Sequence, residues 1–152
     1  MAPDFPSPRS RAASAGARVA QVALVLLALA VVIAVGIPIA HQRALRAQRM
    51  EARLALEDIQ RAEERALLRD GRYAASLTVA APQGLGRSAR SVRGRYLLTV
   101  EVTAGSAIPS FVARARSVGN TDPACSSFSL TQSGVRGAQD TQGRDTTDQC
   151  WR

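Results

Sequence analysis

The stretch VALVLLALAVVIAVGIPIA, residues 22–40, decides the fold of this chain, because every residue in it is apolar, Gly or Pro. A helix over this stretch, at about 1.5 Å per residue, is roughly 28 Å long, which matches the hydrocarbon core of a bilayer. The next residues, 42–69, are charged, rich in Ala and Leu, and free of Gly and Pro. We therefore expect one helix that spans a membrane at residues 17–41 and continues as an amphipathic helix over 42–70.

The continuation has a face of small apolar residues at spacings of three and four: Ala52, Ala55, Ile59, Ala62 and Ala66. This spacing places them on one side of a helix, where they are suited to packing on a thin sheet or on neighbouring helices. Asp70–Gly71 is a typical end of such a helix, with glycine at the C-cap.

Residues 71–152 are enough for one small head domain. Its first part, 72–93, contains Pro and Gly and predicts a long connecting loop. Alternating segments predict strands at 96–103, 111–116 and 127–131, with a turn at 104–106 and a short fourth strand that begins at Val135. The expected fold is α+β, with the long N-terminal helix packed on a three- or four-stranded antiparallel sheet.

The two cysteines, Cys125 and Cys150, lie in the last part of the chain. With a single His and no CxxC motif, the pattern of a metal site is missing, and we expect neither a metal nor a cofactor. We therefore predict a disulfide between the two cysteines, which would close a loop of about 26 residues, contribute roughly 3 kcal/mol, and require an oxidising compartment such as the periplasm. The alternative is two unpaired thiols in a cytosolic domain.

The flanks of the apolar stretch bear on the orientation of the chain. Arginines flank the stretch on both sides, so the positive-inside rule does not decide the orientation and leans slightly toward a cytoplasmic head; we give the cysteines more weight and place the head outside the cytoplasm. The apolar stretch is too long for an ordinary secretory signal, and Pro38–Ile39–Ala40 is a poor cleavage site. Residues 1–16 are basic and rich in Pro, Ser and Ala, and we interpret them as a disordered leader peptide.

The net charge of the chain is +8, and all twenty basic residues are arginine. A high-GC genome explains this bias, and a surface that binds anions is the functional alternative. Six arginines precede the first predicted strand or share a face of the second: Arg87, Arg90, Arg93, Arg95, Arg114 and Arg116. If they converge, they form a basic stripe for phosphate contacts with DNA; otherwise they are ordinary solvated arginines.

Catalysis finds no support in the sequence. The only histidine, His41, follows the apolar stretch and suits the edge of a membrane better than the role of a general base. Ser, Asp and His form no catalytic motif, and no Gly-rich phosphate loop follows a predicted strand. We therefore expect no enzyme activity.

The order of these parts resembles the type IV pilins over nearly the whole chain. Gly16–Gln21 resembles the site of prepilin peptidase, and Pro38 stands where the family has a helix-bending proline. Asp70–Gly71–Arg72–Tyr73 resembles the sequence motif at the C-terminal end of the pilin helix. The region from Cys125 to Cys150–Trp151 resembles the disulfide-bounded C-terminal region of one pilin subgroup.

The resemblance implies cleavage of the leader after Gly16 and methylation of the new N-terminus at Ala17. It also implies assembly through the apolar helix, with roles for Gln21 and Pro38. Two residues differ from the family pattern: Ala17 replaces an aromatic residue, and Gln21 replaces a Glu that pairs with the N-terminal amine of a neighbouring subunit. Because Gln cannot neutralise an ammonium, the replacement implies weak entry into the filament or a special place such as its tip.

The implied function is a structural subunit of a type IV pilus, and a minor pilin in particular. Its expected partners are other pilin subunits, the inner membrane, prepilin peptidase and the pilus assembly machinery. Two alternatives stay open: a minor pilin that binds DNA during DNA uptake, and a single-pass membrane-anchored periplasmic protein that does not polymerise. The resemblance does not choose among twitching motility, cell adhesion, DNA uptake and secretion.

Overall fold

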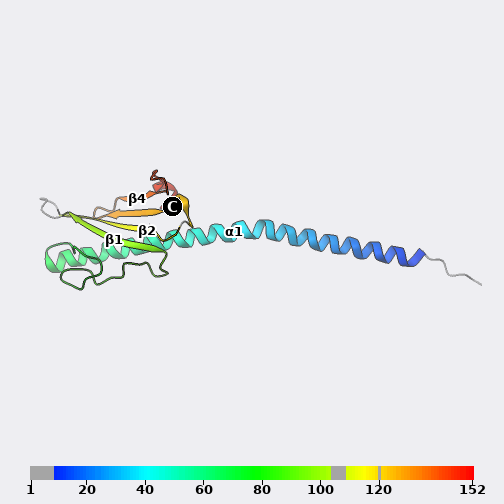
Figure 1. Ribbon diagram of the computed structural model, residues 1–152, viewed down its shortest axis with the longest axis horizontal. Helices are drawn as coiled ribbons and strands as arrows, with labels where there is room; N and C mark the ends of the chain where they lie inside the picture. Colours follow the sequence, from blue (N-terminus) through cyan, green and yellow to red (C-terminus); the bar gives the residue numbers. More distant parts are fainter. Residues whose placement is uncertain (1–8, 104–108, 120) are drawn as a thin grey trace, which may run out of the picture. The chain divides into compact units, whose positions relative to one another are not determined.

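The computed structural model describes residues 9–103, 109–119 and 121–152, and their side chains from Gly16 onward. The chain divides into two compact units, Met1–Arg43 and Ala44–Arg152, and each is described by itself. Helix α1, Arg9–Asp70, contributes to both units and continues through Pro38 and His41 without interruption (Figure 1). The predicted single helix is therefore confirmed.

The first unit presents an apolar helical surface. All side chains from Gly16 to Arg43 are exposed, and those of Val19 and Leu24 are 70% and 66% exposed. The helix is long and apolar enough to cross a membrane. An apolar surface of this extent requires lipid or other helices to cover it.

The start of α1 corrects one expectation about the leader. Residues 9–16 were expected to be disordered, but α1 begins at Arg9 and makes them helical. Arg and Ala, which dominate this stretch, have high helix propensity and extend a helix that already exists on their C-terminal side. Residues 1–8, which contain three prolines, lie outside the described part of the chain.

The second unit contains a four-stranded antiparallel sheet in the order β1-β2-β3-β4. The strands are β1 (Tyr96–Thr103), β2 (Ser110–Ser117), β3 (Ser127–Thr131) and β4 (Arg136–Gln139). The predicted bounds of β1 and β3 are confirmed, β2 is one residue longer at each end, and β4 begins one residue after Val135. The segment 72–93 forms no helix or strand, as predicted, and the turn expected at 104–106 lies outside the described residues.

The core of the second unit lies between α1 and one face of the sheet. Alternation along the strands turns every second side chain toward α1, and most of these are buried, whereas Val100 and Val102 are half-buried. The helix adds its small-residue face, of which only Ala55 is not buried. One cluster unites the two elements: Ala52, Leu56 and Ile59 from α1 with Tyr96, Leu98, Phe111, Phe128 and Leu130 from the sheet. The predicted packing of the amphipathic helix on one sheet face is therefore confirmed.

The C-terminal end of α1 has the predicted glycine cap. Gly71 adopts a φ of +68°, and its N–H donates to the carbonyl of Leu67 at 2.9 Å. This left-handed conformation carries a steric penalty for residues with a Cβ, so glycine is favoured where the chain leaves the helix.

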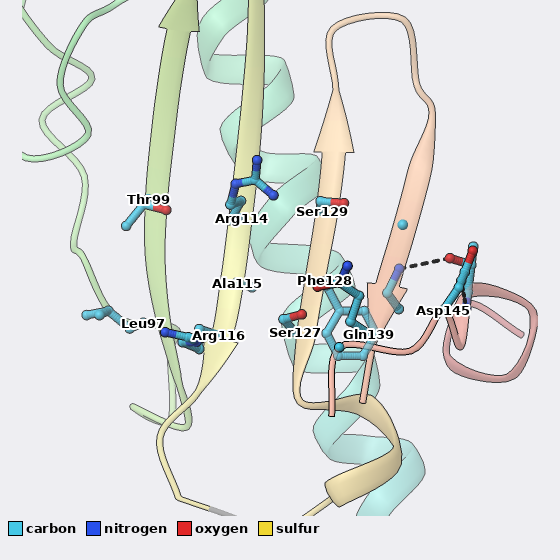
Figure 2. A pocket seen from close by; sticks show the side chains of 14 residues that line it. Leu97, Thr99, Arg114, Ala115, Arg116, Ser127, Phe128, Ser129, Gln139 and Asp145 are labelled. Carbon is cyan, nitrogen blue, oxygen red and sulfur yellow. Dashed lines mark hydrogen bonds between the residues drawn. The ribbon is translucent and has the colours of Figure 1, made fainter. Parts of the chain in front are cut away.

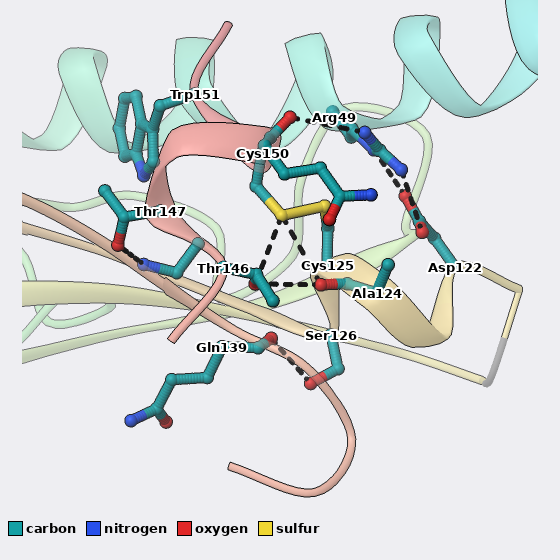
Figure 3. The surroundings of a disulfide bond; sticks show 12 residues. Arg49, Asp122, Ala124, Cys125, Ser126, Gln139, Thr146, Thr147, Cys150 and Trp151 are labelled. Carbon is teal, nitrogen blue, oxygen red and sulfur yellow. Dashed lines mark hydrogen bonds and ion pairs between the residues drawn. A yellow bond between two sulfur atoms is a disulfide. The ribbon is translucent and has the colours of Figure 1, made fainter. Parts of the chain in front are cut away.

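The disulfide between Cys125 and Cys150 is present, as predicted, and both residues are fully buried. It joins the 3₁₀ helix η1 (Pro123–Cys125) to the short helix α2 (Thr147–Cys150). Beside it, Arg49 of α1 donates from Nε and Nη2 to the two carboxylate oxygens of Asp122, at 2.6 and 3.2 Å (Figure 3). The C-terminal region is thus held both to the sheet and to the helix.

Arg53 of α1 completes this attachment at the end of the chain. Its Nη1 donates to the carbonyls of Trp151 and Arg152, at 2.9 and 2.7 Å. Trp151 in turn donates from its indole N–H to the carbonyl of Gly137 in β4, at 2.9 Å. The last residues therefore connect the edge strand of the sheet to α1.

Candidate nucleic-acid interface

The face of the sheet away from α1 is built by the residues that the alternation leaves out of the core. In register, one row across the sheet contains Leu97, Arg116, Ser127 and Gln139. The next row contains Thr99, Arg114, Ser129 and Gly137. Both arginines therefore lie on an inner strand of the sheet, and their neighbours within these two rows are uncharged.

These two rows line a hollow of about 550 Å³ on the sheet surface (Figure 2). Gly137 belongs to its floor, and a Cβ at this position would lie only 2.5 Å from Ser129 Oγ. A residue larger than glycine would therefore push the Ser129 side chain out of its place. The hollow needs small residues on β3 and β4, and the sequence supplies them.

The charge of the hollow comes mainly from Arg114 and Arg116. Arg114 is exposed and lies 3.5 Å from Glu101, measured from Nε to Oε1, and Glu101 is also exposed. A surface pair of this length contributes little energy and gives way readily to another anion. Arg116 is exposed and forms no ion pair among the described residues.

The opposite rim of the hollow carries a carboxylate, Asp145. A bridge pairs Asp145 with Gln139, so it extends the row that contains Arg116. The backbone N–H of Thr147 donates to Asp145 Oδ1 at 2.8 Å, and this bond, together with one from the Thr147 hydroxyl, lowers the pKa of the carboxyl group below its usual value. Asp145 is therefore ionised at neutral pH.

The structure places five of the six predicted arginines in two groups. Arg114 and Arg116 line the hollow, whereas Arg87, Arg90 and Arg93 border a separate groove beside the Met50 and Leu54 side chains of α1. Arg87 forms an ion pair with Asp58 of α1, so its charge is largely neutralised. The six arginines therefore do not all converge into one stripe, which was the condition for the phosphate-binding alternative.

Arg90 also lies near the start of β1, as does Arg95, the last of the six. Arg90 is paired with Leu97 by an isolated bridge, which extends the Arg116 row by one strand position. Arg95 is half-buried, and its carbonyl accepts from the N–H of Val118 at 2.7 Å. Two strand spacings separate Arg90 from Arg116, about 10 Å between backbones.

The other residues singled out in the sequence lie in the first unit. Gly16, Ala17, Gln21 and Pro38 are all exposed on α1, and so is His41. A Cβ at Gly16 would meet no other part of the chain within 4 Å. Within the described residues, nothing in this unit brings these positions together into a pocket.

Sequence reasoning missed the hydroxyl and amide side chains of the hollow and the structural role of two arginines. The signal for Ser127 and Ser129 was present, because they alternate with buried Phe128 and Leu130. Arg49 and Arg53 gave no such signal, since their partners lie far along the chain, 73 residues away for Asp122.

Comparison with known proteins identifies the family of this chain. Residues 41–129, more than half of the chain, match the family described as "Type IV minor pilin ComP, DNA uptake sequence receptor". A solved structure of a type IV pilin from Shewanella oneidensis is similar, with 26% identity over 60% of this chain and 89% of that chain and a TM-score of 0.45. Comparison with curated proteins gave no match. The family match, together with the long helix packed on a four-stranded sheet, shows that the chain belongs to the ComP family of type IV minor pilins.

Proposed function

We propose that this minor pilin binds duplex DNA during DNA uptake, and that the hollow on the outer sheet face holds the phosphate backbone. The observation that carries the proposal is the placement of Arg114 and Arg116, side by side in a hollow whose other lining residues are mostly small or uncharged, with Asp145 as the one carboxylate among them. The description of the family as a receptor for DNA uptake sequences supports the same function.

The chemistry of the hollow suits phosphate oxygens. Guanidinium groups donate two parallel hydrogen bonds to a phosphate, and Ser and Thr hydroxyls add further donors. Arg114 and Arg116 are two residues apart on one strand face, about 7 Å along the strand. Thr99, Ser127 and Ser129 surround them, so one stretch of backbone meets both charges and several hydroxyl groups.

Duplex DNA is a better ligand for this surface than a single strand. Proteins that bind single strands stack the bases on exposed aromatic side chains. Among the described residues, Phe128 is the only aromatic that lines the hollow, and it is 1% exposed because it packs in the core. Stacking is therefore unavailable in the hollow, whereas phosphate contacts need none.

The test is a binding titration of the full-length protein in detergent with a fluorescent duplex at two salt concentrations. Arg114→Ala/Arg116→Ala is compared with Arg61→Ala/Arg65→Ala, which removes the same charge from exposed positions on α1. We expect the first variant to lose most of the affinity and the salt dependence to fall by nearly two charges, at about 0.9 per phosphate contact. No binding by the wild type at low salt would exclude the function, and equal loss in both variants would exclude the site.

We further propose that prepilin peptidase cleaves after Gly16, that Ala17 becomes the methylated N-terminus, and that the assembly machinery then inserts the subunit into a pilus. The exposed apolar side chains between Gly16 and Arg43 support this, because on leaving the membrane they need burial against other pilin helices. Gln21 and Pro38 lie in that contact surface. The buried disulfide supports a periplasmic head, since disulfides persist in oxidising compartments.

N-terminal sequencing of the protein isolated from membranes and from sheared filaments tests this processing. A mature chain that begins at Ala17 in both fractions is the expected result. An intact Met1 or Ala2, with no protein in the filament fraction, would instead identify a fixed anchor. Gln21→Glu is expected to increase the amount of subunit in filaments, because a carboxylate neutralises the N-terminal amine of a neighbour.

A further inference from the structure

The chain makes a tight turn at residues 91–94, just before β1. The N–H of Gly94 donates to the carbonyl of Ser91 at 2.8 Å, and Gly94 has a φ of +70°. Val92 and Arg93 are therefore the two central residues of the turn. Val92 is 100% exposed, and Arg93 is exposed as well. The turn thus presents one apolar and one cationic side chain to its surroundings.

Helix α1 holds this turn in place through Glu51. Oε1 of Glu51 accepts hydrogen bonds from the hydroxyl of Ser91 and from the backbone N–H of Arg93, the latter at 2.9 Å. The Ser91 hydroxyl oxygen in turn accepts from the N–H of Tyr96 at 3.0 Å. Because the backbone of the turn is fixed at both ends, Val92 stays outside the core.

We propose that this turn contacts the anionic lipid headgroups of the membrane in which the apolar part of α1 is anchored. Arg90 and Arg93 supply the cations, and Val92 between them supplies the apolar side chain. Cations are attracted to anionic lipid headgroups, and apolar side chains beside them enter the boundary between headgroups and acyl chains. The contact goes beyond the proposed function and does not depend on DNA binding.

The groove beside the turn extends the same chemistry. Met50 and Leu54 of α1 line it together with Val92 and Arg93, and their side chains are 48% and 53% exposed. Arg90 and Arg93 form no ion pair among the described residues. Apolar side chains and available cations therefore share one surface, as in proteins that bind to the surface of a membrane.

The two acids among the described residues of this groove are bound within the head. Glu51 accepts from the turn, and its second oxygen, Oε2, is buried. Asp58 forms an ion pair with Arg87. The two exposed arginines are therefore not opposed by a free carboxylate that would repel an anionic surface.

The length of the chain between the membrane span and Glu51 keeps the turn close to the lipid. Glu51 is eleven residues beyond Ala40, the last residue of the apolar stretch, and eleven helical residues are about 16 Å long. The headgroup region occupies roughly 5–8 Å of that distance. A surface tethered so closely meets the headgroups at a high effective concentration, so a weak contact suffices.

Valine at the exposed position favours a lipid surface over a second DNA contact. The backbone of a duplex offers phosphates to Arg90 and Arg93 but nothing apolar to Val92. At a membrane, the same side chain leaves water for the acyl boundary, which is favourable. A membrane therefore accounts for all three side chains, whereas DNA accounts for the arginines alone.

The experiment uses the full-length protein, one copy in each nanodisc, with an environment-sensitive fluorophore on Val92→Cys. The discs contain phosphatidylcholine alone or phosphatidylcholine with phosphatidylglycerol, and lipids with a quencher near the headgroup report contact. The native cysteines are disulfide-bonded, so the new thiol is the one that reacts. Val135→Cys, at a position that is 63% exposed in the connection between β3 and β4, carries the control fluorophore.

We expect a blue shift and quenching at position 92 in the anionic discs, and little of either at position 135. Salt is expected to reduce the quenching, because it screens the attraction. Arg90→Ala/Arg93→Ala is expected to lower the ratio of docked to undocked heads about fivefold for each arginine, about 25-fold together. Arg65→Ala/Arg72→Ala removes the same charge from exposed positions elsewhere and is expected to change little.

Four results would overturn the proposal: equal quenching at the two positions, equal quenching in neutral discs, equal loss in the two arginine variants, and quenching that appears only in discs with two copies. The last result would identify a contact between copies. Loss of duplex binding by Arg90→Ala/Arg93→Ala without quenching in anionic discs would assign the turn to DNA. The comparison of the two fluorophore positions needs no arginine variant, so it decides the question even where a variant does not fold.

Discussion

Arginines have different roles on the two faces of the sheet in the second unit: on one face they bind groups of the chain itself, and on the other their charge remains available. On the α1 side, Arg49 and Arg53 are half-buried; Arg49 donates from Nε and Nη2 to Asp122, and Arg53 donates from Nη1 to the carbonyls of Trp151 and Arg152. On the outer face, Arg114 and Arg116 are exposed and have at most a long surface pair. Net charge indicates that a surface can bind anions. The partners that the fold supplies determine which arginines remain available to bind them.

The largest expected effect follows from breaking the inner group. Arg49→Ala leaves the Asp122 carboxylate, whose side chain is 2% exposed, without a cation. Removal of one partner from a buried pair costs about 3–5 kcal/mol, a large share of the stability of a small domain. Denaturant unfolding followed by the fluorescence of Trp151, the single tryptophan, measures the loss.

Arg49→Ala/Asp122→Asn serves as the control for this prediction. The double variant has no unpaired buried charge and is expected to be more stable than Arg49→Ala alone. If the two variants unfold at the same denaturant concentration, the pair does not hold the C-terminal region to α1, and the contrast between the two arginine groups loses its energetic basis.

The next effect comes from opening the disulfide. Cys125→Ala/Cys150→Ala releases a loop with a sequence separation of 25 residues, and the loop-entropy relation gives a cost of roughly 3 kcal/mol. Much of the hollow lies within this loop, including Ser127, Ser129 and Gln139. We expect lower stability and weaker DNA binding, measured by denaturant unfolding and by titration, and reduced wild-type protein is expected to match the variant.

A smaller effect compares single arginines directly. Arg116→Ala is expected to weaken DNA binding about tenfold at low salt, whereas Arg87→Ala is expected to change it little, because Asp58 already neutralises Arg87. Both variants remove one positive charge, so a difference in their affinities at equal salt concentration reports the position of the removed arginine and not the net charge. Equal weakening by the two variants would mean that only the net charge of the head matters.

Much of the fold was predictable because its signals are local. Alternation gave the bounds of β1 and β3, the spacing of Ala52, Ile59 and Ala66 gave the buried helix face, and Gly71 marked the end of α1. Each of these patterns reports burial on one side of a single element. The leader was the exception, since helical propensity around residues 9–16 outweighed its composition.

The candidate site was only partly predictable, because its charges depend on distant partners. Asp58 reaches Arg87 across 29 residues, and no local pattern in the sequence distinguishes Arg87 from Arg116. Gln139 and Asp145 lie in a polar stretch without periodicity and join the hollow only through strand pairing and the disulfide. Long-range pairing, rather than residue type, therefore determines where a basic surface remains available.

The smallest expected effect concerns Glu63 of α1, an acidic residue to which the same distinction between paired and unpaired groups applies. Glu63 is fully buried; its Oε2 accepts from the N–H of Ala74 at 2.8 Å, while Oε1 has no partner among the described residues. Burial raises the pKa of this carboxyl, and the bond from Ala74 opposes the shift only in part. The folded state therefore binds the proton more tightly than the unfolded chain, so the stability from Glu63 is present at acidic pH and is lost as the pH rises through the raised pKa.

Glu63→Gln keeps the hydrogen-bond acceptor and removes the charge. At pH 8 we expect the unfolding temperature of this variant to exceed that of the wild type by a few degrees, which corresponds to about 1 kcal/mol. At pH 4 we expect a smaller difference. A difference that does not grow with pH would show that Glu63 is ionised in the folded head and has a partner other than Ala74.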